Sequence, residues 1–324
     1  MTPENLAPPG AIVAEIQAAD GVRLRTARWS PPDSPRGTVA IFGGRGEFIE
    51  KYSEVVDELL SRNFGVALMD WRGQGGSARP LRNPRKGHVD DFSHFVRDLD
   101  AFTASVLKSH CPRPWFGLAH SLGAAVLLIA DEAGRCPFDR LVLVSPMIAL
   151  KGVSLNGPAS IALEALDMLG LGGTFVPGEG SGNMWSRPFE GNVFTTDPAR
   201  FERVARLIAA APEYSLGGPT IGWANAAFRA MRRFQDPNFP RRTTTPILVI
   251  AAGSDRVTDT RAAERFASRL GRGRIIVIDG AEHEILIERD HFRRQFWAAF
   301  DAFVPGSEAE NESAKGPPLA AGVR

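Results

Sequence analysis

The sequence predicts an α/β fold in which a mostly parallel, doubly wound sheet carries a helical insertion above one edge. Short, continuous apolar runs recur along the chain, and helical patterns lie between most of them. This alternation stops between Ser145 and Thr245 and then resumes. Alternating strands and helices produce a parallel sheet, because each helix returns the chain to the same end of the sheet. At 324 residues and 44% hydrophobic content, the chain can form one large core and still accommodate an insertion.

The strands are predicted from two kinds of pattern. Residues Ile12–Ile16 and Val22–Trp29 alternate in polarity around Asp20-Gly21, which favours an antiparallel hairpin at a sheet edge. Six later runs are continuously apolar, as parallel strands buried on both faces usually are. These runs are Val39–Phe42, Val66–Met69, Trp115–Leu118, Leu141–Val144, Ile247–Ala251 and Ile275–Ile278.

Helical patterns follow the first three buried runs. They cover Tyr52–Arg62, Phe92–Leu107 and Leu122–Glu132. The last pattern is followed by Gly134, where a left-handed residue would close the helix.

The insertion contains three further helical patterns, at Ala159–Leu169, Pro198–Ala210 and Ile221–Phe234. Asp197 precedes a proline and is expected to cap the second of them. An insertion at this point would lie above the carboxyl ends of the strands, where α/β sheets bind ligands. The expected organisation is a catalytic core of residues 1–145 and 246–304, a helical cap of residues 146–245, and a disordered tail of residues 305–324.

The cap helices carry more apolar side chains than solvent-facing helices need. We expect Leu166, Met168 and Trp223 to contact substrate as part of a tunnel for an acyl chain. The alternative is that these side chains only pack the cap onto the core, since amphipathic helices need such a face in any case.

Composition excludes several classes of partner and cofactor. The net charge is +1, so no basic surface for nucleic acid or an anionic membrane is indicated. No apolar run approaches the length of a membrane span, and residues 1–10 lack a signal-peptide pattern, so the cytoplasm is the expected compartment. Cys111 and Cys136 lack metal-site spacing, and we predict reduced thiols, although neighbouring strand starts could bring them close. No cofactor or metal is predicted.

Ser121 is the candidate nucleophile. It lies in Ala119-His120-Ser121-Leu122-Gly123, between a predicted strand and a predicted helix. In this context a tight turn lifts a serine hydroxyl above the sheet, and small neighbours avoid a clash. His120 points away from the nucleophile at such a turn and is interpreted as a packing residue.

A serine hydroxyl needs an imidazole to accept its proton. Of the six histidines, His120 adjoins Ser121 and three others precede it, whereas the histidine of this arrangement follows the serine in sequence. Of the two that follow, His291 falls within a helical pattern and His283 lies on a loop just past a strand. His283 is therefore the candidate base, against the alternative of a solvated loop histidine.

The acid that orients the histidine should follow the preceding strand. Asp255 comes directly after Ile247–Ala251 at the required position. Asp259 begins the next helical segment and is expected to cap it, and Asp279 belongs to the loop of the histidine itself.

A tetrahedral intermediate also needs two backbone N–H donors. One is expected from Leu122, and the other from the loop Gly43–Glu47 after the first buried strand. That glycine-rich loop could instead bind a dinucleotide, but Ile49 stands where the third glycine of that motif would be.

The chain resembles the monoacylglycerol lipases and bacterial lysophospholipases of the α/β-hydrolase superfamily from Val39 to Phe303. The resemblance implies that Ser121, Asp255 and His283 form the catalytic triad, and that the N–H groups of Arg45 and Leu122 bind the oxyanion. This chain has Gly43-Gly44 where members of the family commonly have His-Gly, and it has Ala119 where they commonly have glycine. The matching segments are Gly43–Glu47 with Lys51-Tyr52, Asp70–Ser77, Gly87–Val89, Ala119–Gly123, Gly253–Val257 and Gly280–Leu286.

The expected function is hydrolysis of a carboxylic ester through an acyl-enzyme on Ser121. The resemblance implies lysophospholipids or monoacylglycerols as substrates, and a lipid substrate implies transient contact with a membrane surface. Two alternatives stay open: acyl transfer to an alcohol, and a catalytically silent binding protein. Dehalogenase and most epoxide hydrolase chemistry is disfavoured, because those enzymes use a carboxylate nucleophile. The sequence does not predict the oligomeric state.

Overall fold

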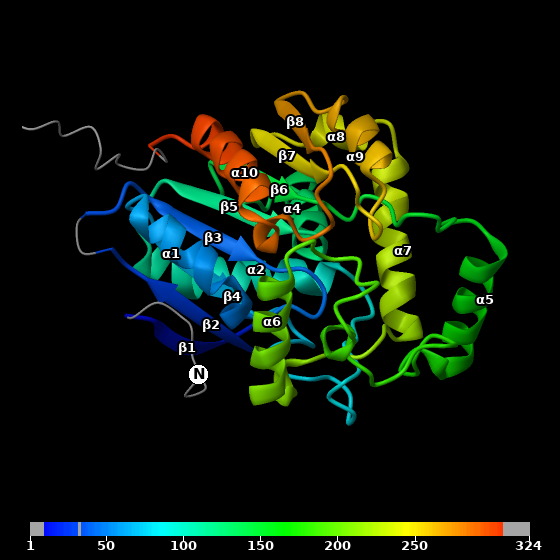
Figure 1. Ribbon diagram of the computed structural model, residues 1–324. Coiled ribbons are helices and arrows are strands. Elements are labelled where there is room, and N and C mark those ends of the chain that lie inside the picture. The colour runs from blue at the N-terminus through cyan, green and yellow to red at the C-terminus, as the bar shows by residue number, and fades with distance from the viewer. Residues whose placement is uncertain (1–9, 32–33, 307–324) are drawn as a thin grey trace, which may run out of the picture.

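One twisted sheet organises the molecule (Figure 1). The computed structural model describes residues 10–31 and 34–306. Among these residues, eight strands lie in the order β1-β2-β4-β3-β5-β6-β7-β8. The strands are β1 Ile12–Gln17, β2 Arg23–Trp29, β3 Thr38–Phe42, β4 Gly65–Met69, β5 Trp115–His120, β6 Arg140–Val144, β7 Ile247–Ala252 and β8 Gly273–Ile278.

The N-terminal hairpin is the antiparallel part of the sheet. β1 pairs antiparallel with β2, and β2 pairs antiparallel with β4, while every other pair of neighbours is parallel. The predicted edge hairpin and mostly parallel sheet are therefore confirmed. The carboxyl ends of β5, β7 and β8 meet at one end of the sheet, where the loops after them can converge.

β8 departs from the prediction that all six apolar runs are buried on both faces. Ile276 and Val277 are 40% and 38% exposed. The prediction is wrong here because β8 is the last strand of the sheet and has a neighbouring strand only on the β7 side.

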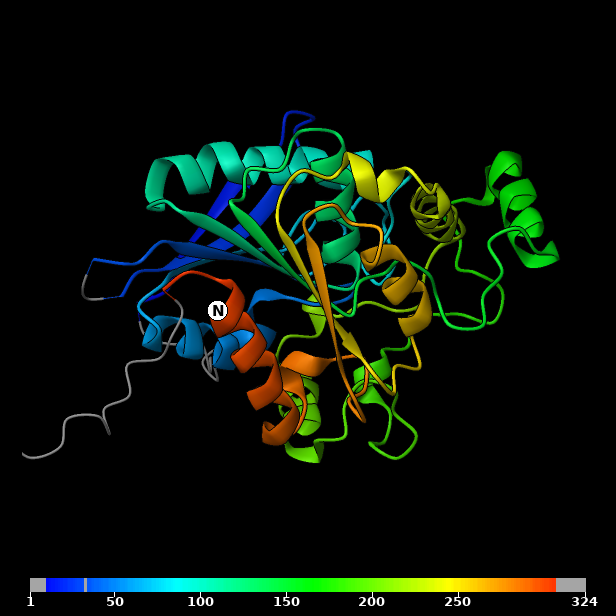
Figure 2. The same ribbon diagram turned by 90° about the horizontal axis from the view of Figure 1, so that it is seen from above.

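Helices cover both faces of the sheet, so the doubly wound arrangement is confirmed. Alternate residues of β3 separate the two cores: Ala40 and Phe42 face one, and Val39 and Ile41 face the other. Figure 2 shows α2 on one side of the sheet and α1 and α10 on the other. The helices of the core are α1 Ser53–Ser61, α2 Ser93–Phe102, α3 Lys108–His110, α4 Leu122–Glu132, α9 Thr260–Ala267 and α10 Asp290–Phe303.

The helix ends follow the local signals in the sequence. α4 has the predicted bounds, and Gly134 after it has φ +68, as a left-handed residue at a helix end should. The predicted helix Phe92–Leu107 is α2 continued by a π-helical turn at Thr103–Leu107.

Between β6 and β7 the chain forms α5 Pro158–Leu166, α6 Pro198–Ala210, α7 Ile221–Gln235 and α8 Phe239–Arg242. Asp197 caps α6 by accepting hydrogen bonds from the N–H groups of Ala199 and Arg200. α6 packs in a third apolar cluster that includes Phe48 and Ile287, which lie in the segments that follow β3 and β8. The insertion is thereby anchored over the loops that carry the candidate catalytic residues.

Three further predictions concern the two cysteines, membrane-spanning helices and the C-terminal tail. Cys111 and Cys136 carry free thiols, and burial raises the pKa of each to about 11. Across the described ranges, none of the helices has the length and apolar character needed to cross a membrane. The predicted disordered tail lies, beyond residue 306, outside the described residues.

Candidate active site

Ser121 occupies a strained turn between β5 and α4. Its φ is +49 and its ψ is −108, a backbone conformation that few residues other than glycine adopt. Such strain persists only where the surroundings enforce it, and it is a property of the nucleophile elbow. Gly123 shows what enforces it, because a Cβ there would lie 2.4 Å from the carbonyl oxygen of Phe42. The start of α4 therefore packs directly on the end of β3.

His283 and Asp255 come together from loops after β8 and β7. The Nδ1 of His283 lies 2.8 Å from Oδ2 of Asp255, and both side chains are buried. Asp259, by contrast, caps α9 through the N–H of Ala262, as expected. The structure thus bonds the predicted histidine to the predicted acid, and the catalytic roles of both stay a prediction.

Asp255 is held in its ionised form. Its Oδ1 accepts hydrogen bonds from the N–H groups of Val257 and Thr258 at 2.7 and 2.8 Å. Burial opposes ionisation, but the hydrogen bonds from His283 and Thr258 outweigh it, so the pKa of Asp255 is lowered. A carboxylate facing Nδ1 makes that nitrogen the donor, which leaves Nε2 of the neutral ring free to accept a proton.

The third member of the predicted triad is buried as well. Ser121 is 9% exposed, whereas His283 is 3% exposed. Within the described part of the chain, their side chains share no hydrogen bond. Catalytic hydrogen bonds are often long or poorly aligned until a substrate is bound.

In the glycine-rich loop after β3, the N–H groups on either side of Arg45 are bonded, and that of Arg45 is bonded to no described residue. The N–H of Gly44 donates to Oε2 of Glu47 at 2.6 Å, and the N–H of Gly46 donates to Oε1 of Gln74 at 3.2 Å. Among the described residues, the N–H groups of Arg45 and Leu122 donate to no other group. These are the two donors predicted for the oxyanion, and the structure leaves both available for one.

The segment after β4 forms two hydrogen bonds with the Gly43–Glu47 loop. Trp71 donates from Nε1 to the carbonyl of Gly43 at 3.0 Å, and Gln74 donates from Nε2 to the carbonyl of Gly44 at 2.7 Å. These two bonds fix the backbone beside Arg45.

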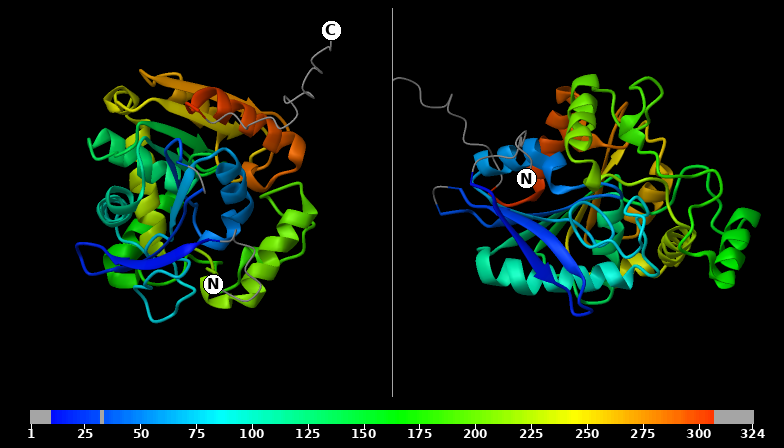
Figure 3. Two further views of the ribbon diagram at one scale, coloured as in Figure 1. Left: turned by 90° about the vertical axis from the view of Figure 1, so that its left-hand side faces the viewer. Right: turned by 90° about the horizontal axis from the view of Figure 1, so that it is seen from below.

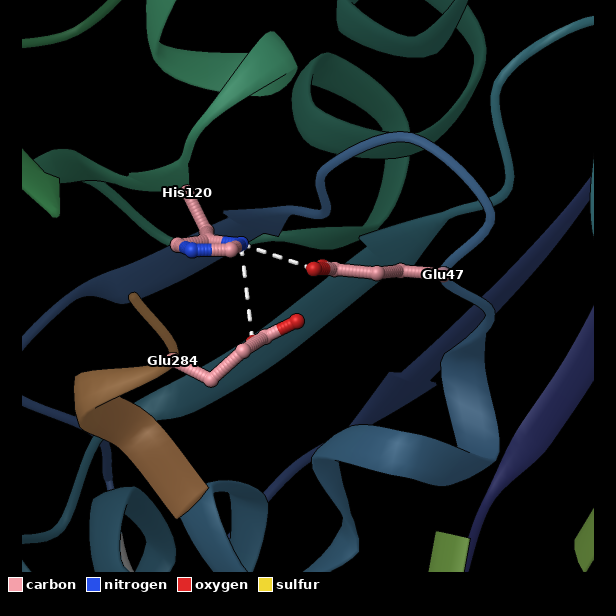
Figure 4. Close-up of side chains that lie close together, drawn as sticks. All are labelled: Glu47, His120 and Glu284. Atoms are coloured by element: carbon pink, nitrogen blue, oxygen red, sulfur yellow. Dashed lines mark hydrogen bonds and ion pairs between the residues drawn. The ribbon is translucent and has the colours of Figure 1, made fainter. Parts of the chain in front are cut away.

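Buried charged side chains lie next to the loop that carries His283, and Figure 4 shows three of them, Glu47, His120 and Glu284. His120 contacts Oε1 of Glu47 through Nδ1 at 2.7 Å, and it lies 3.7 Å from Oε2 of Glu284. The Nζ of Lys51 lies 2.9 Å from Glu47 and 2.6 Å from Glu284. All four residues are buried, so each charge depends on its partners.

The second nitrogen of His120 reaches the histidine loop. Nε2 lies 3.3 Å from the carbonyl oxygen of His283, and the two rings are 4.7 Å apart. Both neighbours of the His120 ring are acceptors, so both nitrogens donate when the ring is an imidazolium. Burial opposes that charge, but Glu47 and Glu284 outweigh it and raise the pKa of His120.

The carboxylates of the cluster differ. Burial opposes ionisation of Glu47, yet Lys51 and His120 hold its pKa well below the usual value. Burial and the negative charge of Glu47 raise the pKa of Glu284. With Lys51 and His120 as cations, the cluster is balanced in charge.

Glu47, His120 and Glu284 also have the donor atoms of a metal site, since these atoms lie within 4.8 Å of one another. The ammonium of Lys51 already bridges the two carboxylates, so a metal ion would have to displace it. The residues therefore fit a lysine-bridged structural cluster better than a metal centre. The interpretation of His120 as a packing residue missed this cluster. Its only signal in the sequence was that all four residues lie within the matching segments.

The predicted acyl tunnel is not formed as expected. Met168 is 87% exposed and Leu166 is half-buried. Figure 3 shows α5 projecting from the rest of the molecule, and α5 packs on α7. The prediction that Met168 lines an enclosed tunnel is wrong, because its side chain, in the π-helical turn Asp167–Leu171 after α5, is exposed. Trp223 is buried instead, under the guanidinium of Arg45 at 5.0 Å.

Curated proteins similar in sequence are lipid ester hydrolases by name. The chain is 33% identical over 294 residues to lysophospholipase L2 of Escherichia coli K12, which covers 86% of this chain and 83% of that protein. It is 28% identical to a probable lysophospholipase L2 of Haemophilus influenzae, with 85% of each chain covered. Rat monoglyceride lipase is 25% identical over 81% of this chain and 78% of its own length.

Solved structures share the fold at low sequence identity. A soluble variant of monoglyceride lipase from Saccharomyces cerevisiae, bound to a substrate analogue, superposes with a TM-score of 0.72 at 17% identity, covering 92% of this chain and 97% of its own. A carboxyl esterase from Bacillus coagulans gives 0.70 at 19% identity, covering 92% and 99%. The family model of the serine aminopeptidases, S33, matches residues 33–290. The chain therefore belongs to the serine aminopeptidase S33 family of α/β hydrolases.

Proposed function

We propose that this chain is a serine carboxylic ester hydrolase that forms an acyl-enzyme on Ser121 and acts on lysophospholipids or monoacylglycerols. The observation that carries the proposal is the buried His283–Asp255 hydrogen bond beside a serine at φ +49. Asp255 fixes the tautomer of His283, and the strained turn exposes a hydroxyl at the start of a helix.

The reaction follows from these positions. His283 Nε2 accepts the proton of the Ser121 hydroxyl while its oxygen attacks the ester carbonyl carbon. The carbonyl oxygen becomes an oxyanion, which the N–H groups of Arg45 and Leu122 stabilise. The imidazolium returns its proton to the departing alcohol, and the acyl group stays on Ser121. Water activated by His283 then releases the fatty acid.

The substrate class is supported by the names of the relatives, which are lysophospholipases and monoglyceride lipases. We assign the cap role to residues 146–245, because α6 packs on the loops beside the candidate site. Transient contact with a membrane surface is part of the proposal, and the exposed apolar side chains of Ile161, Met168 and Leu169 support it. The cytoplasmic location stays a prediction.

Product analysis tests the function. Purified protein is incubated separately with a lysophospholipid, a monoacylglycerol and a short-chain ester of glycerol. Each incubation is run with and without an added alcohol acceptor. We expect free fatty acid as the main product in both conditions. New ester in the presence of the acceptor would identify an acyltransferase, and no product from any ester would identify a silent binding protein.

A further inference from the structure

The side chain of Arg45 runs from the oxyanion loop toward the cap. Its Nη2 donates to the carbonyl of Gly217 at 3.0 Å, and its guanidinium lies 5.0 Å from the ring centre of Trp223. Its Nε is buried without any hydrogen-bond partner. Within the described ranges, no carboxylate comes within 4.0 Å of the guanidinium.

Two buried arginines of the chain are, by contrast, paired with carboxylates. Arg25 pairs with Glu50 and Asp70, and Arg72 pairs with Asp98 and Asp20. A guanidinium has five N–H donors, and burying its charge without a partner costs free energy. Buried polar groups without partners therefore call for an explanation.

Arg45 is nevertheless a cation at neutral pH. Burial lowers the pKa of its guanidinium to about 10, against the attraction of Glu179. Glu179 lies in an exposed segment of the cap and forms no ion pair with Arg45. The result is a positive charge at the candidate site that lacks a close counterion.

We propose that Arg45 binds the phosphate of an anionic glycerolipid, so that the site selects a lysophospholipid over a neutral monoacylglycerol. This rests on the proposed function, because it places the ester carbonyl at the backbone N–H of the same residue. A phosphate oxygen pair matches the planar fork of a guanidinium, and such charge-assisted bonds are among the strongest in proteins.

One substrate molecule could contact both the backbone N–H and the guanidinium of Arg45. The backbone N–H of Arg45 is free for the oxyanion, and its guanidinium lies a side-chain length away, against Trp223. In a lysophospholipid, the glycerol separates the ester from the phosphate by only a few bonds, a span comparable with an arginine side chain. One residue would then bind both ends of the head group. The side chain is half-buried, so it is not sealed from a ligand.

A structural tie is the competing role, because Arg45 also joins the oxyanion loop to the cap through Gly217. The test compares 1-decanoylglycerol with 1-decanoylglycerol 3-phosphate, below their micelle concentrations, for the unmodified enzyme, Arg45→Gln and Arg45→Lys. The backbone N–H is kept in both variants. We expect Arg45→Gln to lower the ratio of kcat/KM for the phosphorylated over the neutral ester by about ten- to one-hundredfold. The loss should fall mainly on KM, and Arg45→Lys should restore part of it.

Arg79 provides a matched control. It is also half-buried, burial lowers its pKa to about 10, and it joins a core loop to the cap through the carbonyl of Glu213. Unlike Arg45, it reaches two further carbonyls, those of Gly73 and Gly75. Arg79→Gln should leave the substrate ratio unchanged.

An equal fall for both esters in Arg45→Gln, or no fall, would overturn the proposal in favour of a structural tie. Competition separates a head-group site from a site for free phosphate. Glycerol 3-phosphate should inhibit hydrolysis of 1-decanoylglycerol, and Arg45→Gln should relieve this inhibition. Equal inhibition by inorganic phosphate would overturn the head-group assignment. In each of these overturning outcomes the unmodified enzyme still hydrolyses both esters. Failure of the proposed function would instead appear as no turnover of either ester.

Discussion

The loops at the strand ends and the first cap helix are built in opposite ways. Around the candidate site, Gly44, Gly46 and Asp255 are all fixed by short hydrogen bonds to defined partners. On α5, Ile161 is 61% exposed, and Met168 in the π-helical turn Asp167–Leu171 that follows is 87% exposed; α5 packs on α7 and on this turn. The sheet therefore fixes the loops of the candidate site, whereas the outer part of the insertion contributes little to them in this conformation.

Removing the nucleophile should have the largest effect. Ser121→Ala should reduce kcat by about 10⁴- to 10⁶-fold, because no other group can form the acyl-enzyme. The measurement is ester turnover, with circular dichroism to show that the fold is kept. Retention of more than a few per cent of activity would place the nucleophile elsewhere.

Removing the charge of Asp255, which is hydrogen-bonded to His283, should have the next largest effect. Asp255→Asn should lower kcat by about 10²- to 10⁴-fold, since an amide cannot stabilise the imidazolium. Asp259→Asn is the matched control, because it changes only the cap of α9 and should leave kcat within a few-fold. If the two variants behaved alike, Asp255 would not be the triad acid.

The buried charged cluster should affect stability more than chemistry. Glu47→Gln leaves Lys51 and His120 short of a partner, and we expect the free energy of unfolding at pH 7 to fall by about 3–5 kcal/mol. The pKa of Glu47 is lowered on folding, so the stability that its charge provides is present above its usual pKa of 4.5 and is lost as the pH falls below it.

The difference between the unmodified protein and Glu47→Gln should therefore narrow on acidification below about pH 4.5. Urea unfolding at a series of pH values measures this. A difference that stayed constant over that range would show that Glu47 is not ionised in the folded protein.

The smallest effect is expected at Met168, in the turn Asp167–Leu171 that follows α5. Met168→Glu should change the free energy of unfolding by less than about 0.5 kcal/mol, because the side chain contacts mainly solvent. It should also leave the relative rates on acetyl and decanoyl esters in solution unchanged. A selective loss on the longer ester would show that α5 closes over the acyl chain and would remove the contrast between the two regions.

Local patterns were sufficient for most of the fold. Residues Leu122–Glu132 and Pro198–Ala210 form helices with the predicted bounds; Gly134 follows the first, and Asp197 caps the start of the second. The strands could be predicted because parallel strands are apolar on both faces. β8 is an exception, since an apolar run does not reveal that its strand lies at the sheet edge.

The site was predictable where it depends on strand order. Asp255 and His283 follow consecutive strands of a parallel sheet, so their proximity follows from topology. The Lys51–Glu284 pair does not, because it joins distant segments through the packing of loops. The exposure of Met168 could not be predicted either, because an amphipathic pattern does not show whether another element covers the apolar face.

Identification of the covalently modified residue tests the central claim most directly. The protein is treated with a fluorophosphonate probe, digested, and analysed by mass spectrometry. We predict one adduct, on the hydroxyl of Ser121, formed more slowly in Asp255→Asn and absent in Ser121→Ala. An adduct on another residue, or undiminished labelling of Ser121→Ala, would contradict the assignment of Ser121 as the nucleophile.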